Sequence, residues 1–120
     1  MASGQQKHAD YLKALSLLGK DLARRAKSRC ELSGEPGRLV NHDLFPDDRA
    51  PSLETVVLVN EDVSAWLNGS PINPNQARFL EHTVWSTEPA VQTACRRLLA
   101  LIDEPWAKEA IENLEIMGAP

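Results

Sequence analysis

The sequence predicts a small α+β protein, in which an N-terminal helix, an irregular β-hairpin and a cluster of three to four helices form a single domain over residues 1–120. Three observations predict this class. Apolar residues recur at helical spacing in 5–29 and in 73–117, a β-branched run lies between them, and no internal repeat or linker divides the chain. With 42% hydrophobic residues, a chain of 120 residues can bury one modest core.

The first segment, 5–29, is predicted to be an amphipathic helix. Its apolar positions recur at spacings of four, three and four residues: Tyr11, Leu15, Leu18 and Leu22. The turn-forming residues 33–37 follow the helix and bring it to an end. We expect the apolar stripe either to pack on the rest of the domain or to join two copies of the chain.

The middle segment, 30–68, is predicted to contain the hairpin and a short helix. The run Val56–Val59 is typical of a buried strand, and Arg38–Leu44 suits its partner strand. A proline-bounded loop joins the two strands. Asn60 then stands where it can cap the short helix that follows.

The last segment, 73–117, is predicted to be helical. One helix runs from Asn73 through Val84, a second begins near Thr87, and Pro105 opens a third. Proline at the first position of a helix is well tolerated, because its missing N–H would have no partner there in any case.

Tryptophan and cysteine side chains in the helical segments are predicted to serve the core. Cys95 lies on the apolar stripe of its helix, so we expect a buried and inert thiol. The tryptophans fall at helical positions beside apolar residues, which favours core packing over stacking on nucleic-acid bases. They are Trp66, Trp85 and Trp106.

The net charge of −4 hides an uneven distribution. Residues 1–38 contain eight basic and four acidic side chains, and residues 39–120 contain five basic and thirteen acidic ones. Such a division can mark a nucleic-acid-binding face or complementary packing between subunits. The interpretation we favour is simpler: the basic residues gather near the end of the predicted first helix, where they complement its dipole and stay solvated. The candidate phosphate-binding residues are Arg24, Arg25, Lys27, Arg29 and Arg38.

The sequence gives no sign of a membrane protein or of a secreted one. No apolar run approaches the roughly 18 residues that a membrane-spanning helix needs. The polar N-terminus does not resemble a secretory signal, and two cysteines are too few for a disulfide framework. We therefore expect a cytoplasmic protein with free thiols.

The turn Cys30–Gly34 has the spacing of half a zinc knuckle, but its second ligand position is Ser33. In a knuckle, two cysteines of a Cys-x-x-Cys turn bind one tetrahedral zinc ion. The second half of such a site is expected after the buried strand, at Asn60–Val63, and neither end of that stretch is a cysteine. The frame of a zinc ribbon is thus predicted without three of its four ligands, and we expect no bound metal and no cofactor.

The sequence resembles the N-terminal region of the PhnA-like family, which is named for an alkylphosphonate-utilisation operon. The resemblance covers about 20–116 and is most specific in a Trp-Ser-x-x-Pro-Ala-Val-Gln segment. Four stretches carry it in order: Ser28–Leu32, Val57–Val59, Val84–Gln92 and Asp103–Trp106.

The resemblance implies a zinc-ribbon or treble-clef-like hairpin in which most metal ligands have been lost. Members that bind zinc place cysteines at four positions, which here are Cys30, Ser33, Asn60 and Val63. The SH3-like domain that usually follows in the family has no counterpart in residues 1–120. Because the activity of the family is poorly defined, the resemblance implies a fold and a lineage more than a reaction.

Two functions are open from the sequence. The first is a non-catalytic interaction or scaffold module that binds a partner protein or a second copy of itself. The alternative is a nucleic-acid-binding protein or a worn HNH-type nuclease, in which His42 in the hairpin would activate water and Asn60 would be a further ligand. His82 does not have the spacing that this nuclease motif requires, and no nucleotide-binding or hydrolase motif is present.

Overall fold

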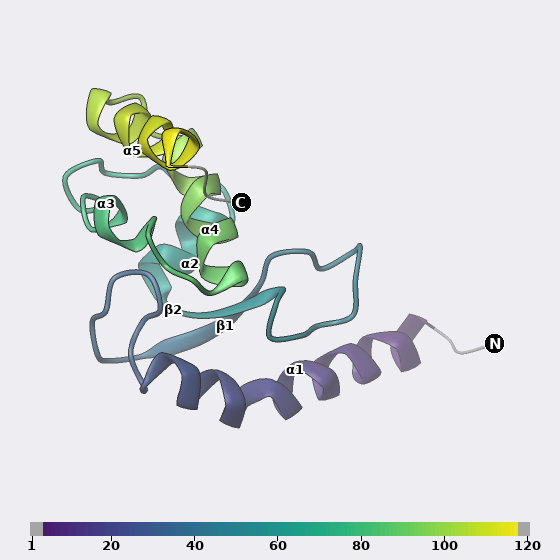
Figure 1. Cartoon of the computed structure of the whole chain (residues 1–120). Coiled ribbons are helices and arrows are strands. Elements are labelled where there is room, and N and C mark those ends of the chain that lie inside the picture. The colour runs from purple at the N-terminus through teal and green to yellow at the C-terminus, as the bar shows by residue number, and fades with distance from the viewer. Residues whose placement is uncertain (1–3, 118–120) are drawn as a thin grey trace.

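The structure is a computed structural model that describes residues 4–117. It confirms the α+β class, with an N-terminal helix, a two-stranded antiparallel hairpin and then several helices (Figure 1). The elements are α1 (Gly4–Ala26), β1 (Leu39–Asp43), β2 (Val56–Asn60), α2 (Glu61–Leu67), α3 (Leu80–Thr83), α4 (Pro89–Ala100) and α5 (Pro105–Ile116). The two strands pair from Leu39 opposite Asn60 to Asp43 opposite Val56.

The hairpin lies between two layers of helix, with α1 on one side and α2, α4 and α5 on the other (Figure 1). Val56 and Leu58 of β2 belong to a small core that contains Leu22 of α1. Val57 and Val59 point to the opposite face and belong to the main core. Because both faces of β2 are covered, the strand is a continuous apolar run rather than an alternating one, as the sequence predicted.

The first helix ends at Ala26, three residues before its predicted end. Lys27 and Ser28 have positive φ angles of 56° and 58°, and the N–H of Ser28 donates to the carbonyl of Ala23 at 2.9 Å. This bond occupies one of the carbonyls that a helix terminus leaves free. The chain turns here into the Cys30 segment.

The apolar stripe of α1 packs on the hairpin of the same chain, so it is not left exposed for a second copy. Leu22 is fully buried, and Leu15 and Leu18 pack against the same small core. Tyr11, at the start of the stripe, donates a hydrogen bond of 2.8 Å to Asp43 of β1. Any self-association therefore needs another surface.

The main core is formed by the helices that follow the hairpin. Val91, Cys95 and Leu98 of α4 are buried, as are Ala110 and Leu114 of α5. These positions repeat at three and four residues, so each helix presents one apolar face to the core. The predicted burial of Cys95 is confirmed.

The predicted helix from Asn73 to Val84 is wrong in extent. Only Leu80–Thr83 is α-helical, and the residues before it form consecutive turns. Asn73 does not cap a long helix, because its Oδ1 accepts the N–H of Asn75 at 2.9 Å in a local turn.

The prediction that all three tryptophans anchor the core is also wrong in one case. Trp66 is buried and Trp106 is partly buried against the core, whereas the side chain of Trp85 is 50% exposed. Trp85 follows the end of the short α3, so no helical register turns it inward.

Among residues 4–117, no helix has both the length and the apolar character needed to span a membrane.

Candidate functional site

The four positions at which the sequence resemblance implies zinc ligands lie next to one another at the end of the hairpin. The Sγ of Cys30 accepts the N–H of Ser33 at 3.4 Å. The Nδ2 of Asn60 donates to the Oγ of Ser33 at 3.4 Å, and the Oδ1 of Asn60 accepts the N–H of Val63 at 2.8 Å. A continuous chain of hydrogen bonds therefore links the Cys30–Gly34 turn to the start of α2.

The side chains at these positions do not fit a zinc site. They offer one thiol, one hydroxyl, one amide and one isopropyl group, whereas structural zinc is held by thiolates and imidazoles. Cys30 and Val63 are buried in the main core, and the Asn60 oxygen caps α2. Throughout the described residues 4–117, no group of three or more His, Cys, Asp or Glu side chains is placed to hold a metal ion.

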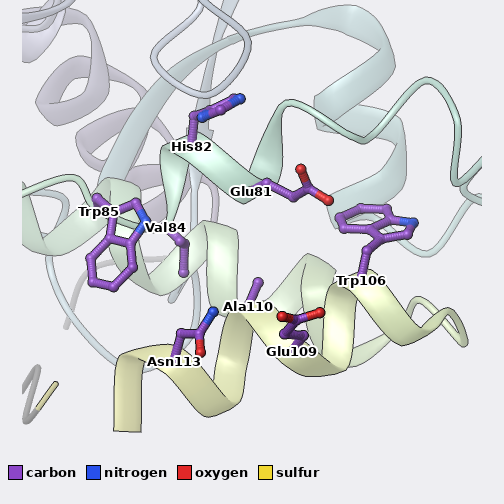
Figure 2. Close-up of a pocket in the computed structure, with 8 residues that line it drawn as sticks. All are labelled: Glu81, His82, Val84, Trp85, Trp106, Glu109, Ala110 and Asn113. Carbon is purple, nitrogen blue, oxygen red and sulfur yellow. The ribbon is translucent and has the colours of Figure 1, made fainter. Parts of the chain in front are cut away.

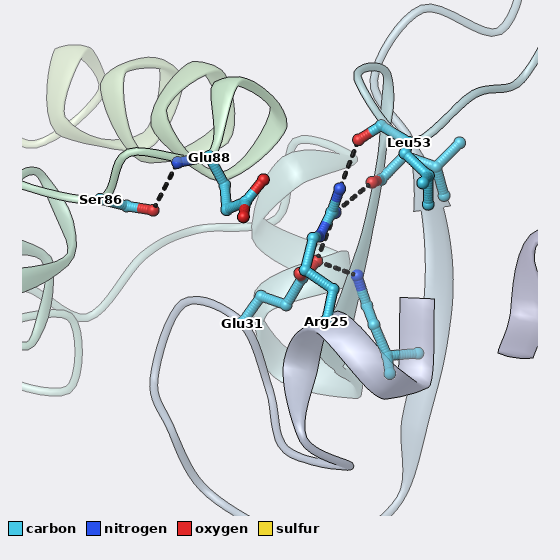
Figure 3. A network of polar contacts seen from close by, with 7 residues as sticks. Arg25, Glu31, Leu53, Ser86 and Glu88 are labelled. Atoms are coloured by element: carbon cyan, nitrogen blue, oxygen red, sulfur yellow. Dashed lines mark hydrogen bonds and ion pairs between the residues drawn. The ribbon is translucent and has the colours of Figure 1, made fainter. Parts of the chain in front are cut away.

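A buried ion pair between Arg25 and Glu31 closes the outer edge of β2 (Figure 3). Arg25 Nε donates to Glu31 Oε1 at 2.6 Å and Nη2 donates to Oε2 at 2.9 Å. The Arg25 side chain is 13% exposed and that of Glu31 is 4% exposed. The bond to Glu31 raises the pKa of Arg25, so this guanidinium stays charged.

Both members of the pair also bind the backbone of the strand. Glu31 donates its N–H to the carbonyl of Leu58 at 2.8 Å, and its Oε2 accepts the N–H of Leu58 at 2.9 Å. Arg25 donates to the carbonyls of Leu53 and Val56. Polar groups that a free strand edge would present to another chain are thereby satisfied.

This pairing corrects the predicted set of phosphate-binding residues. Arg25 is committed to Glu31 and the β2 edge, so it cannot also serve as a surface cation. Lys27 and Arg29 are exposed, but they line a hollow of about 250 Å³ together with the carboxylates of Glu31 and Glu88. The Glu88 carboxylate opposes the approach of a phosphate, whereas the Glu31 carboxylate is already paired with Arg25.

The remaining two predicted cations lie apart from that hollow. Arg24 is exposed on α1, 4.0 Å from Asp21, and the exposed Arg38 is 3.3 Å from Glu61. Surface pairs of this kind contribute little to stability. The structure thus distributes the predicted cations along α1, the following turn and the start of the hairpin.

The candidate catalytic residue His42 lies on β1, half-buried against α2. Its Nδ1 is 3.0 Å from the Oγ of Ser64. Burial lowers the pKa of His42, and nearby Arg97 acts in the same direction while Asp43 opposes it. This ring nitrogen is thus bonded within the protein, and no metal-ligating cluster in residues 4–117 includes His42.

The other parts of the proposed nuclease motif are separated from His42. The side-chain oxygen of Asn60 accepts the N–H of Val63 as the cap of α2. His82 is exposed on α3 and lines a different hollow, between α3 and α5. Among the described residues 4–117, neither His42 nor His82 belongs to a group of side chains placed to hold a metal ion.

A groove between α3 and α5, which we call the tryptophan groove, was not predicted from the sequence (Figure 2). Its volume is about 350 Å³. Trp85 and Trp106 stand at its two ends, with Glu81 and Glu109 between them, and Asn113 lies below Trp85. The groove joins residues far apart in sequence, and the only signal for it was an aromatic residue at the end of a short helix.

The two ends of the tryptophan groove differ in whether a neighbouring cation covers the tryptophan ring. Arg78 lies 5.0 Å from the ring centroid of Trp106 and pairs with Glu81 at 2.7 Å. Trp85 has no such cover, and on its other side it lines a second, more apolar hollow of about 580 Å³ with Leu114. The Trp85 end is therefore the open end of the groove.

Comparison with protein-family models gave no match, and no significant match was found among curated proteins or solved structures. The residues that carry a function are therefore identified from the geometry and chemistry of this chain.

Proposed function

We propose that the protein is a non-catalytic interaction or scaffold module built on a PhnA-like zinc ribbon that is held together without zinc. The observation that carries this proposal is the chain of hydrogen bonds through the four ribbon positions. They bring the two halves of the ribbon together as a metal would, with protein groups in place of the ion. The positions are Cys30, Ser33, Asn60 and Val63.

Physical chemistry supports a ribbon that is stable without a metal. Each intramolecular hydrogen bond contributes about 1 kcal/mol, and buried Cys30 and Val63 add apolar contacts that a metal-binding thiolate would not make. The pair Arg25–Glu31 fixes the outer edge of β2 to the same turn. Together these contacts replace the constraint that zinc supplies in metal-bound ribbons.

A non-catalytic role is supported by the state of the reactive side chains. Burial raises the pKa of the Cys95 thiol to about 12, so it is protonated at neutral pH and a poor nucleophile. The Nδ1 of His42 is bonded to the Oγ of Ser64, so this nitrogen is not free to hold a metal ion. Within residues 4–117, neither group belongs to a cluster of three or more His, Cys, Asp or Glu side chains placed to hold a metal ion.

The first test is the metal content of protein purified without added chelator. We expect no stoichiometric zinc, and we expect the thermal denaturation midpoint to be the same with added zinc and with added chelator. One zinc ion per chain, or a midpoint that falls when a chelator is added, would contradict the proposal.

The second test restores the missing ligands with the triple substitution Ser33→Cys, Asn60→Cys and Val63→Cys. We expect this variant to bind one zinc ion per chain, and cobalt to give the absorption of a tetrahedral thiolate site. The matched control adds Cys30→Ser to the same triple variant and should bind either metal far more weakly. A triple variant that is folded by circular dichroism and binds neither metal would exclude the ribbon arrangement.

A further inference from the structure

The face of α1 that points away from the hairpin carries a second stripe, which we call the outer stripe. It consists of Lys13, Leu17, Lys20 and Arg24, at spacings of four, three and four residues. All four are exposed, and Leu17 is 73% exposed. This face therefore offers one apolar side chain among three cations, which complements a surface that combines an aromatic side chain with carboxylates.

The tryptophan groove has the complementary chemistry. Trp85 is 50% exposed between the two hollows, so its indole offers an apolar surface to a partner. Within the described residues 4–117, the exposed carboxylate of Glu109 takes part in no hydrogen bond or ion pair. Glu112 and Glu115 are exposed on the same helix, α5. The groove therefore combines an aromatic anchor with unneutralised negative charge.

We propose that the outer stripe of one copy of this chain docks into the tryptophan groove of a second copy. Leu17 would pack against Trp85, while Lys20 and Arg24 would face Glu109 and its neighbours on α5. The uneven charge of the chain supports a second copy as the occupant, because residues 1–38 carry a net positive charge and residues 39–120 carry a net negative charge. This inference rests on the proposed interaction function and assigns its surfaces.

The two surfaces cannot meet within one molecule. The outer stripe lies on α1, and the hairpin and the main core separate α1 from α3 and α5 (Figure 1). The contact therefore joins two different patches, and each copy has one of each. Contacts of this heterologous kind either extend head to tail or close into a ring, rather than stop at a symmetric dimer.

The test is sedimentation velocity over a range of protein concentrations at low and high ionic strength. At low salt we expect a mass above that of the monomer that rises with concentration, and we expect added salt to return it toward the monomer, because ions screen surface charges. Leu17→Glu should leave the protein monomeric. Leu12→Glu is the matched control: Leu12 is 51% exposed on α1 but lies off the outer stripe, and this variant should associate like the parent.

The groove side is tested with Trp85→Ala, which should also be monomeric. Mixing the Leu17→Glu and Trp85→Ala variants then provides the decisive result, because one retains an intact groove and the other an intact outer stripe. We expect the mixture to form a 1:1 complex that grows no further. Circular dichroism checks that both variants are folded.

Several outcomes would overturn the inference. They are a parent protein that stays monomeric at low salt, equal effects of the two leucine substitutions, and a mixture that stays monomeric. A monomer that binds duplex DNA through Lys20 and Arg24 would equally assign the outer stripe to another partner. These failures are distinguishable from a failure of the proposed zinc-free ribbon, which is tested by the metal content, the effect of a chelator on the denaturation midpoint and the cysteine variants.

Discussion

At the scale of single residues, two neighbouring arginines on α1 have opposite surroundings. The Arg24 side chain is 82% exposed, whereas Arg25 is paired with buried Glu31 and bonded to the backbone of β2. Removing one partner of a buried pair leaves the other charged and desolvated, which costs far more than the pair itself contributes. The difference between the two positions can therefore be measured.

We predict that Arg25→Ala lowers the free energy of unfolding by about 3 kcal/mol or more. Arg24→Ala, the matched control on the adjacent residue, should change it by less than about 0.5 kcal/mol. Urea denaturation followed by circular dichroism measures both. Equal effects of the two substitutions would show that the ion pair does not hold the edge of β2.

The single tyrosine of the chain gives a second prediction at this scale. Burial and the hydrogen bond to Asp43 raise the pKa of Tyr11 to about 12, from an ordinary value near 10. Titration followed by phenolate absorbance should therefore have a midpoint well above 10 in the folded protein and near 10 in urea. A native midpoint near 10 would mean that the contact to Asp43 does not form.

The same shift determines how stability depends on pH. Because the folded state holds the Tyr11 proton more tightly than the unfolded state, the contribution is complete below pH 10 and is lost as pH rises toward 12. Tyr11→Phe cannot ionise at this position, so its stability should fall less steeply in that range. Urea denaturation of both proteins at pH 8 and above compares the two slopes.

At the scale of elements, the sequence predicts best where a segment is buried in a simple pattern, either along its whole length or along one face. The run Val56–Val59 and the apolar stripe of α4 were recognised because each lies against a core, and hydrophobic spacing reports that directly. The stretch after Asn73 was read as a long helix, but its asparagine side chain bonds to the nearby backbone. Such local competition leaves little trace in apolar spacing.

The candidate sites show the same division. The turn at Cys30–Gly34 and the Asn60 cap of α2 could be predicted from the sequence, because a turn and a helix cap are local features. The bond between Arg25 and Glu31 forms because the chain turns after α1 and brings Glu31 against β2. The charges of the two residues in the sequence do not predict that turn. The tryptophan groove requires α3 and α5 to pack side by side, so it becomes visible only in three dimensions (Figure 2).

At the scale of the whole molecule, β2 is the element that both layers share. Its alternate residues belong to the small core under α1 and to the main core. If β2 came away from either layer, its side chains in the other layer's core would also be exposed. All three tryptophans lie in the layer of α2 to α5, on the far side of the hairpin from α1. Tryptophan fluorescence therefore reports on one layer, while a substitution in α1 disturbs the other.

We predict that Leu22→Ala lowers the free energy of unfolding by about 2–5 kcal/mol and shifts the transition equally by tryptophan fluorescence and by far-ultraviolet circular dichroism. Leu22 is fully buried against Val56 and Leu58, and loss of its side chain leaves a cavity under the strand that the main core also uses. Leu12→Ala, at an exposed position of the same helix, is the control and should have a small effect. If the fluorescence transition kept its midpoint while the helical signal shifted, the two layers would unfold separately, and β2 would not couple them.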